Sequence, residues 1–194
     1  MMAKSSSWPK IDAVFSLYES YGHADYIGEP VSQIEHMCQA AQLAEQEGYG
    51  AEVILAAFFH DLGHLFAQEN ELEEMDGFGV MDHEKLGAEY LRELGFPELV
   101  ALLVESHVAA KRYLTYKNPE YFRKLSDASK ETLKFQGGVM TAAEALAFEA
   151  DKNHQLILKM RDWDEKAKLT GIPLPDLEKY RKMAKDLLDG PTNS

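Results

Sequence analysis

At residues 56–64 the chain reads AAFFHDLGH, an apolar run that ends in a His-Asp pair and a further histidine. The segment from residue 51 to residue 62 is apolar on almost every side, which predicts a helix buried at the centre of a domain. Gly63 is expected to cap this helix at its C-terminus. The pattern therefore predicts that His60 and Asp61 lie at the end of a buried helix.

The composition indicates one domain over residues 1–194, with 45% hydrophobic residues to form its core. The net charge of −13 argues against nucleic acid as a partner, because phosphate backbones are bound by basic surfaces. No run approaches the roughly 20 apolar residues that span a bilayer, and residues 1–10 lack the apolar segment of a signal peptide. We expect a cytoplasmic protein without a membrane, nucleic-acid or obligatory protein partner.

The chain has helical periodicity nearly throughout, and no stretch shows the alternation that is typical of a strand. In the second predicted helix, for example, apolar residues recur at 34, 37, 38 and 41, which predicts one buried face. Gly and Pro residues separate the segments, and loops are expected at 21–30 and 69–80. The predicted helices cover residues 10–20, 31–47, 51–62, 82–94, 98–110, 119–125, 127–135, 141–150, 153–169 and 176–188. The expected fold class is an all-α bundle.

Four histidines, one in each of four predicted helices, are candidate metal ligands. A single histidine in a helix is most often a core or solvated residue, but histidines from separate helices of a bundle can converge on a metal. His60 and Asp61 are neighbours that point about 100° apart, so both serve one site most easily if it holds two metals roughly 3.5–4 Å apart. Asp61 would then bridge them. Imidazole and carboxylate ligands suit iron, manganese or zinc.

The order of these residues resembles the HD-domain superfamily, whose pattern is H…HD…H…H…D on a helical bundle. In this chain the pattern falls on His36, His60, Asp61, His83, His107 and Asp164. Asp162 is the alternative for the last carboxylate, and we prefer Asp164 because of the residues around it. The resemblance spans nearly the whole chain and implies an HD-domain bundle with a core from about residue 25 to residue 188. Most members of the superfamily are metal-dependent phosphohydrolases.

Two cations are spaced from proposed ligands by a helix turn. Lys111 follows His107 by four residues, and Arg161 precedes Asp164 by three, so each can share a face with its ligand. On a surface both would be ordinary solvated charges. If both face the metals, Arg161 can bind an anionic group bidentately while Lys111 acts as a point charge. In so acidic a chain, such a basic pocket indicates a small anionic substrate.

Five further stretches are similar to a small oxygenase branch of the superfamily, the mixed-valent diiron oxygenases that cleave carbon–phosphorus bonds. These stretches are DYIGE at 25–29, HDLGH at 60–64, HVAAKRYL at 107–114, LSDAS at 125–129 and WDEK at 163–166. The resemblance implies an Fe(II)/Fe(III) pair with O2 as cosubstrate. It assigns one iron to His36, His60, Asp61 and Asp164, and the other to Asp61, His83 and His107.

The same resemblance implies roles for residues that the spacing alone would leave as ordinary. It assigns phosphonate binding to His64, Lys111, Ser129 and Arg161. Without it, His64 would be a loop residue and Ser129 a residue on a helix surface. Tyr26 would occupy an iron position until substrate binds, and Glu29 would then meet the cationic end of the substrate. Both lie in a loop, where such motion breaks few packed contacts.

The implied reaction cleaves a 1-hydroxy-2-aminoethylphosphonate to phosphate and glycine, or its N-trimethylated analogue to phosphate and glycine betaine. The sequence leaves the methylation state open. Aromatic walls would favour a quaternary ammonium, and Tyr26, Phe58, Phe59 and Phe78 are the candidates for such walls. A metal-dependent phosphohydrolase is the alternative enzyme, and an HD module without catalysis is the alternative outside enzymes.

Overall fold

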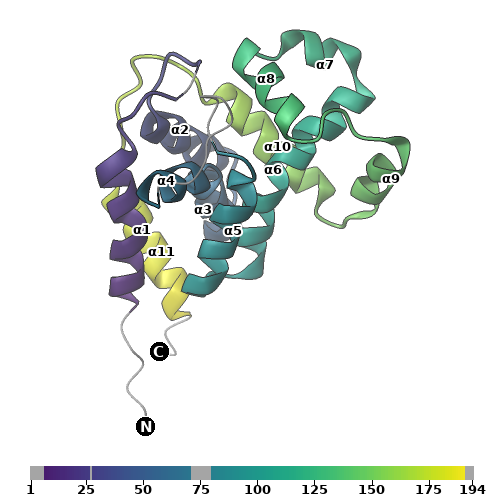
Figure 1. Cartoon of the computed structure of the whole chain (residues 1–194). Helices are drawn as coiled ribbons and strands as arrows, with labels where there is room; N and C mark the ends of the chain where they lie inside the picture. The colour runs from purple at the N-terminus through teal and green to yellow at the C-terminus, as the bar shows by residue number, and fades with distance from the viewer. Residues whose placement is uncertain (1–6, 27, 71–79, 191–194) are drawn as a thin grey trace.

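The computed structural model describes residues 7–26, 28–70 and 80–190, and these residues form an all-α bundle (Figure 1). The helices are α1 (Trp8–Tyr21), α2 (Gln33–Gln46), α3 (Ala51–Phe59), α4 (Leu62–Glu69), α5 (His83–Leu94), α6 (Glu98–Lys117), α7 (Pro119–Lys124), α8 (Asp127–Phe135), α9 (Ala142–Ala150), α10 (His154–Lys166) and α11 (Glu178–Asp189). An isolated antiparallel bridge joins Asp25 and Ser32. The expected fold class is confirmed. Within these ranges, no helix combines the length and the apolar character needed to cross a bilayer.

Helix α3 lies at the centre of the bundle, as its apolar sequence predicts. Helices α2, α6, α10 and α11 all contact it (Figure 1), and Leu55, Phe58 and Phe59 are fully buried. Helices α7, α8 and α9 lie together at one end of the molecule, beyond α6 and α10. Because α3 is enclosed, the residues that follow it also lie inside the protein.

Aromatic stacking fixes the last turn of α3 between the first and last helices. The Phe58 ring stacks on Tyr18 of α1 and on Tyr180 of α11, with 4.6 Å between ring centroids in both pairs. The Tyr18 hydroxyl also donates to the Phe58 carbonyl at 2.9 Å. Helix α1 therefore shares the core with α3 and α11. The buried core thus begins before residue 25, where the sequence resemblance placed its start.

The helix predicted over residues 51–62 is interrupted at the His-Asp pair. Helix α3 ends at Phe59, and Asp61 leaves helical geometry (φ −104°, ψ 12°) before α4 begins at Leu62. The prediction that Gly63 caps α3 is therefore wrong. Gly63 lies in the first turn of α4, where an added Cβ would be 1.8 Å from the carbonyl oxygen of His83. The glycine allows α4 to approach the start of α5, and His64 lies in α4 rather than in a loop.

Other segments also differ from the sequence prediction. The helix predicted over residues 153–169 ends at Lys166, so Lys168 lies outside it. Helix α6 continues to Lys117 rather than ending at residue 110, because no glycine or proline interrupts it and Tyr113 and Thr115 are buried. Lys111 is therefore held on a helix. The loop predicted at 69–80 falls mostly on residues 71–79, which lie outside the described residues.

The loop before α2 is ordered by hydrogen bonds on both sides. The Tyr26 backbone N–H donates to the Val31 carbonyl at 2.9 Å, and the Glu29 N–H donates to the Tyr26 carbonyl at 2.9 Å. Ser32 then starts α2 with a capping box, in which its hydroxyl and the Glu35 carboxylate each accept from the other residue's backbone N–H. These bonds fix where Tyr26 and Glu29 meet the bundle.

The contact at Gly63 leads to a stability prediction. Gly63→Ala is expected to lower the free energy of unfolding of the metal-free protein by about 3 kcal/mol, because the added methyl group forces backbone to move apart in a packed interior. Gly50→Ala is the matched control, since nothing lies within 4 Å of its Cβ position and its φ is −77°. Urea unfolding measures both. Equal stabilities of the two variants would contradict the close approach.

Candidate metal centre

Six buried side chains meet in the interior of the bundle as two groups of three. The first group is His36, His60 and Asp164, and the second is Asp61, His83 and His107. Within each group, the potential ligand atoms lie within 4.8 Å of one another. Helices α2, α5, α6 and α10 and the junction between α3 and α4 supply them. The structure thus brings together every ligand predicted from the sequence.

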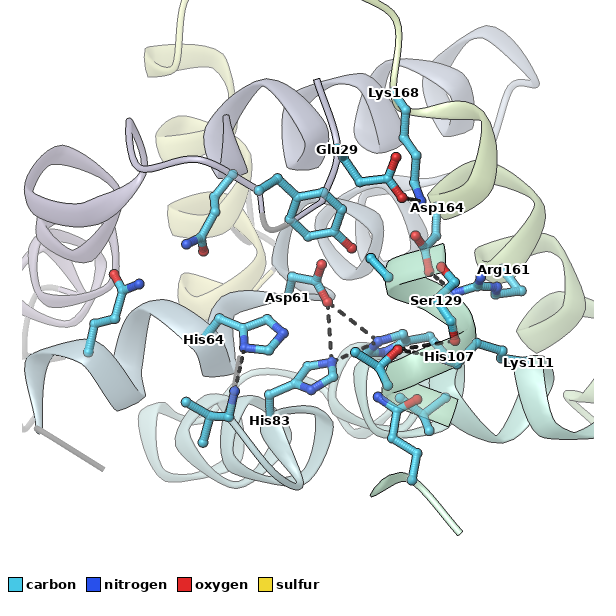
Figure 2. A pocket seen from close by; sticks show the side chains of 18 residues that line it. Glu29, Asp61, His64, His83, His107, Lys111, Ser129, Arg161, Asp164 and Lys168 are labelled. Carbon is cyan, nitrogen blue, oxygen red and sulfur yellow. Dashed lines mark hydrogen bonds and ion pairs between the residues drawn. The ribbon is translucent and has the colours of Figure 1, made fainter. Parts of the chain in front are cut away.

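The Asp61 carboxylate lies between the two groups. Its Oδ2 is 3.5 Å from Nε2 of His36 and 3.4 Å from Nε2 of His60. Its Oδ1 is 3.3 Å from Nε2 of His83 and 3.5 Å from Nε2 of His107. Figure 2 shows the links from Asp61 to His83 and His107. Each oxygen therefore faces one pair of imidazoles, which is the arrangement expected of a carboxylate that bridges two metals.

Backbone carbonyls orient three of the imidazoles. The Nδ1 atoms of His60 and His107 donate to the carbonyl three residues earlier, at 2.8 and 2.7 Å, and Nδ1 of His36 donates to the Ala167 carbonyl at 2.8 Å. A proton on Nδ1 leaves the Nε2 lone pair free to bind a metal. The Nε2 atoms of His36 and His60 are 3.0 Å apart, so both are directed at one point.

Charge and unsatisfied atoms in the centre fit bound metal ions. Burial favours neutral carboxyls, but neighbouring histidines hold the pKa of Asp61, and Arg161 that of Asp164, well below the usual range. Burial also lowers the pKa of His60, yet the negative charge of Asp61 outweighs this and raises it to about 9, so an ion bound at Nε2 of His60 would displace a proton from it. Asp61 Oδ2 and Asp164 Oδ1 are buried without a hydrogen-bond partner, a cost that a metal would remove. The donor set, without thiolate, suits iron, manganese or zinc.

Asp162, the alternative carboxylate, lies away from this centre. Its side chain is 38% exposed and accepts from Lys166 at 2.8 Å on the outer face of α10. Asp164 instead faces inward, with Oδ1 at 3.4 Å from Nε2 of His36. The two residues are thus well suited to a paired metal-binding experiment.

A cavity of about 80 Å³ adjoins the metal centre and has two buried cations on its wall (Figure 2). Arg161 donates from Nη1 to Asp164 at 2.6 Å and from Nε to Glu165 at 2.7 Å, while its buried Nη2 has no partner. Lys111 donates to Thr132 at 2.9 Å, and burial with the nearby Arg161 lowers its pKa to about 7. This side of the cavity is suited to bind a small anion beside the metals.

His64 and Ser129, which the family resemblance selected, also line this cavity (Figure 2). The Val80 N–H donates to Nδ1 of His64 at 3.3 Å, so the ring proton of the neutral imidazole is on Nε2. Burial holds the pKa of His64 well below its ordinary value. His64 is therefore a neutral donor, and Ser129 faces the same space from α8.

Tyr26 and Glu29 line the cavity on the side of α2. The Tyr26 ring stacks on His36 with 4.1 Å between centroids, and burial raises the pKa of its hydroxyl well above the ordinary value, with Asp61 and Asp164 adding to the rise. Glu29 accepts from Nζ of Lys168 at 2.6 Å. All six substrate-contact candidates thus lie at one cavity, and their roles stay predictions.

The sequence did not single out Thr132 or Lys168. Thr132 lies one helix turn after Ser129 on α8, so the spacing could have indicated it once Ser129 was chosen. Lys168 lies beyond the end of α10, and it reaches the cavity only because the chain folds back onto α2. Such a tertiary contact has no periodic signal in the sequence.

The HD domain family model matches residues 34–156. The chain belongs to the HD-domain family. Among its relatives, 1-hydroxy-2-(trimethylamino)ethyl phosphonate dioxygenase (glycine-betaine-forming) of Leisingera caerulea is 40% identical over 92% of this chain and 90% of its own. Hydroxymethylphosphonate dioxygenase of Gimesia maris is 37% identical over 93% and 89%, respectively. An uncharacterized protein of Acanthamoeba polyphaga mimivirus is 41% identical over 95% and 84%. The resemblance of this HD-domain protein to phosphonate-cleaving oxygenases is confirmed.

The position of Asp164 leads to a prediction about metal content. Asp164→Ala is expected to lose the ion held with His36 and His60, because that group keeps only two of its own three ligands. Asp162→Ala is expected to bind as much metal as the unmodified protein. Metal analysis after reconstitution with Fe(II) and removal of free ion gives the stoichiometry. Loss of metal only in Asp162→Ala would contradict the assignment.

Proposed function

We propose that this HD-domain protein is an O2-dependent oxygenase that cleaves the carbon–phosphorus bond of a small anionic 1-hydroxyphosphonate. The observation that carries the proposal is that two buried cations, Arg161 and Lys111, line the same cavity as the candidate two-metal centre, and that Arg161 binds the candidate ligand Asp164 itself. The relatives named as phosphonate dioxygenases support oxygen chemistry over hydrolysis. The ions proposed for the centre are an Fe(II)/Fe(III) pair.

The proposed substrate is 2-amino-1-hydroxyethylphosphonate or its N-trimethylated analogue. One O2 and one 2-amino-1-hydroxyethylphosphonate give one phosphate and one glycine, so all atoms balance. The carbon bearing the hydroxyl group is oxidised to a carboxylate, the bond from that carbon to phosphorus breaks, and O2 is the only oxidant needed. The trimethylated substrate gives glycine betaine in the same way.

The four candidate phosphonate contacts have roles that follow from their chemistry. The unpaired Nη2 of Arg161 and the ammonium of Lys111 bind phosphonate oxygens by charge. His64 donates from Nε2, and Ser129 donates a hydroxyl group. The bound iron pair would supply the redox chemistry and the site at which O2 is activated. Together the four side chains orient the hydroxyl-bearing carbon toward the metals.

At the other end of the substrate, Glu29 is the partner for an ammonium group. It is a carboxylate at the cavity that belongs to neither group of metal ligands. A carboxylate facing an ammonium compensates part of the cost of desolvating the two charges, and a buried ammonium without such a partner would be strongly disfavoured. Tyr26 is the residue that gives up its place beside His36 when substrate enters, since it lies in a loop.

A metal-dependent phosphohydrolase is the second candidate, because the same metals and cations also suit attack of metal-bound water on a phosphoryl group. The two reactions differ in their need for oxygen. Hydrolysis releases phosphate without O2, whereas oxidative cleavage consumes one O2 for each phosphate. Oxygen dependence is therefore the property that separates them.

Oxygen dependence can be measured directly. The protein is reconstituted with Fe(II) without air, partly oxidised, and incubated with 2-amino-1-hydroxyethylphosphonate with and without O2. We expect phosphate and glycine to form only with O2. One phosphate and one glycine should form for each O2 consumed. Asp162→Ala is the control and is expected to behave as the unmodified protein. Equal phosphate release without O2 would identify the protein as a hydrolase.

The role of Glu29 can be separated from metal binding. Glu29→Ala is expected to weaken binding of 2-amino-1-hydroxyethylphosphonate at least about tenfold, because the ammonium loses its counter-charge, while iron content stays unchanged. Substrate affinity and iron content are measured on the same preparation. Loss of iron with unchanged affinity per loaded site would contradict this role.

A further inference from the structure

Glu29 already has an ammonium partner that belongs to the protein. Nζ of Lys168 donates to Glu29 at 2.6 Å, and the two side chains are only 17% and 9% exposed. Lys168 Nζ also lies 5.8 Å from the centroid of the Tyr26 ring. Both Lys168 and Glu29 line the cavity, and Figure 2 shows them side by side. A primary ammonium thus occupies the place that the proposed function gives to the ammonium of the substrate.

The position of Lys168 is fixed by its backbone neighbours. The Ala167 carbonyl accepts from Nδ1 of the candidate metal ligand His36 at 2.8 Å. On the other side, Leu169 donates from its backbone N–H to Gln39 at 3.0 Å and accepts from the Gln39 amide at 2.9 Å. The chain is therefore held against α2 on both sides of Lys168. Only its side chain can move without breaking these bonds.

Glu29 is the only carboxylate, among the described residues that line the cavity, outside the two groups of candidate metal ligands. Asp61 and Asp164, the other two, face histidines and Arg161. A cationic substrate must therefore displace Lys168 from Glu29. A hydroxyphosphonate without an ammonium group can bind its phosphonate at Arg161 and Lys111 while the pair stays intact.

We propose that Lys168 is a specificity-determining residue that competes with the substrate ammonium for Glu29. This inference rests on the proposed function, because it takes phosphonates as ligands of the cavity. Lys168 weakens the binding of aminated hydroxyphosphonates relative to amine-free ones, because only the former must break a partly buried ion pair. Removing the lysine makes the subsite more selective for an ammonium group.

The ratio of two dissociation constants tests the proposal. Calorimetry without O2, on iron-loaded protein, measures binding of 2-amino-1-hydroxyethylphosphonate and of hydroxymethylphosphonate, which has no amine. The ratio cancels any general loss of attraction for phosphonate when a nearby cation is removed. In Lys168→Met, we expect the ratio to shift about tenfold in favour of the amine.

Three further variants serve as controls. Lys168→Arg keeps a cation at Glu29 and is expected to retain the unmodified ratio. Lys166→Met removes a lysine from the exposed face of α10, where it pairs with Asp162, and is also expected to leave the ratio unchanged. If Lys168→Met does not fold, Lys168→Gln removes the charge with a side chain that can still hydrogen bond to Glu29.

The outcomes distinguish this inference from the proposed function. A ratio within about twofold of the unmodified protein, with binding intact, overturns the role of Lys168 alone. A shifted ratio without O2-dependent phosphate release supports Lys168 as a selectivity residue but overturns the oxygenase. Failure of the unmodified protein to bind either phosphonate overturns both.

Discussion

The carboxylate of Asp61 is the constraint on which the arrangement of the helices depends. Its two oxygens face histidines from different helices, at 3.3 to 3.5 Å. Four imidazoles can surround one small carboxylate only if their helices converge on a single point in the core. The break between α3 and α4 supplies that point, and Gly63 permits the close approach of the helix that carries His83. The fold and the candidate metal centre therefore have the same geometric requirement.

Arg161 connects this centre to the anion side of the cavity. Its three guanidinium nitrogens have different surroundings: one binds Asp164, one binds Glu165, and one is buried and unpaired. The planar guanidinium holds these directions fixed relative to one another. An anion bound at the unpaired nitrogen is consequently positioned with respect to the candidate ligand Asp164. A lysine at this place could not transmit the same orientation.

The sequence was most informative where function requires residues in a fixed order on separate helices. The histidines, Asp61 and Asp164 could be selected because the HD pattern is long and specific. The sequence mispredicts the role of Gly63, because a glycine after an apolar run has the same local signal whether it ends a helix or permits contact with another one. The sequence gives no sign of Lys168, because its approach to Glu29 depends on tertiary hydrogen bonds to α2. Local periodicity contains no information about such a contact.

The candidate ligands are far apart along the chain, from His36 to Asp164. The Tyr180 ring, which stacks on Phe58 in the last turn of α3, comes later still in the sequence. This spacing has a consequence for synthesis of the protein. During translation, the second group of ligands is complete once His107 has emerged, whereas the first group waits for Asp164. The two halves of the centre thus become available in succession. An ion that enters early would meet a partly formed site, and the full centre forms only after Asp164 has been made.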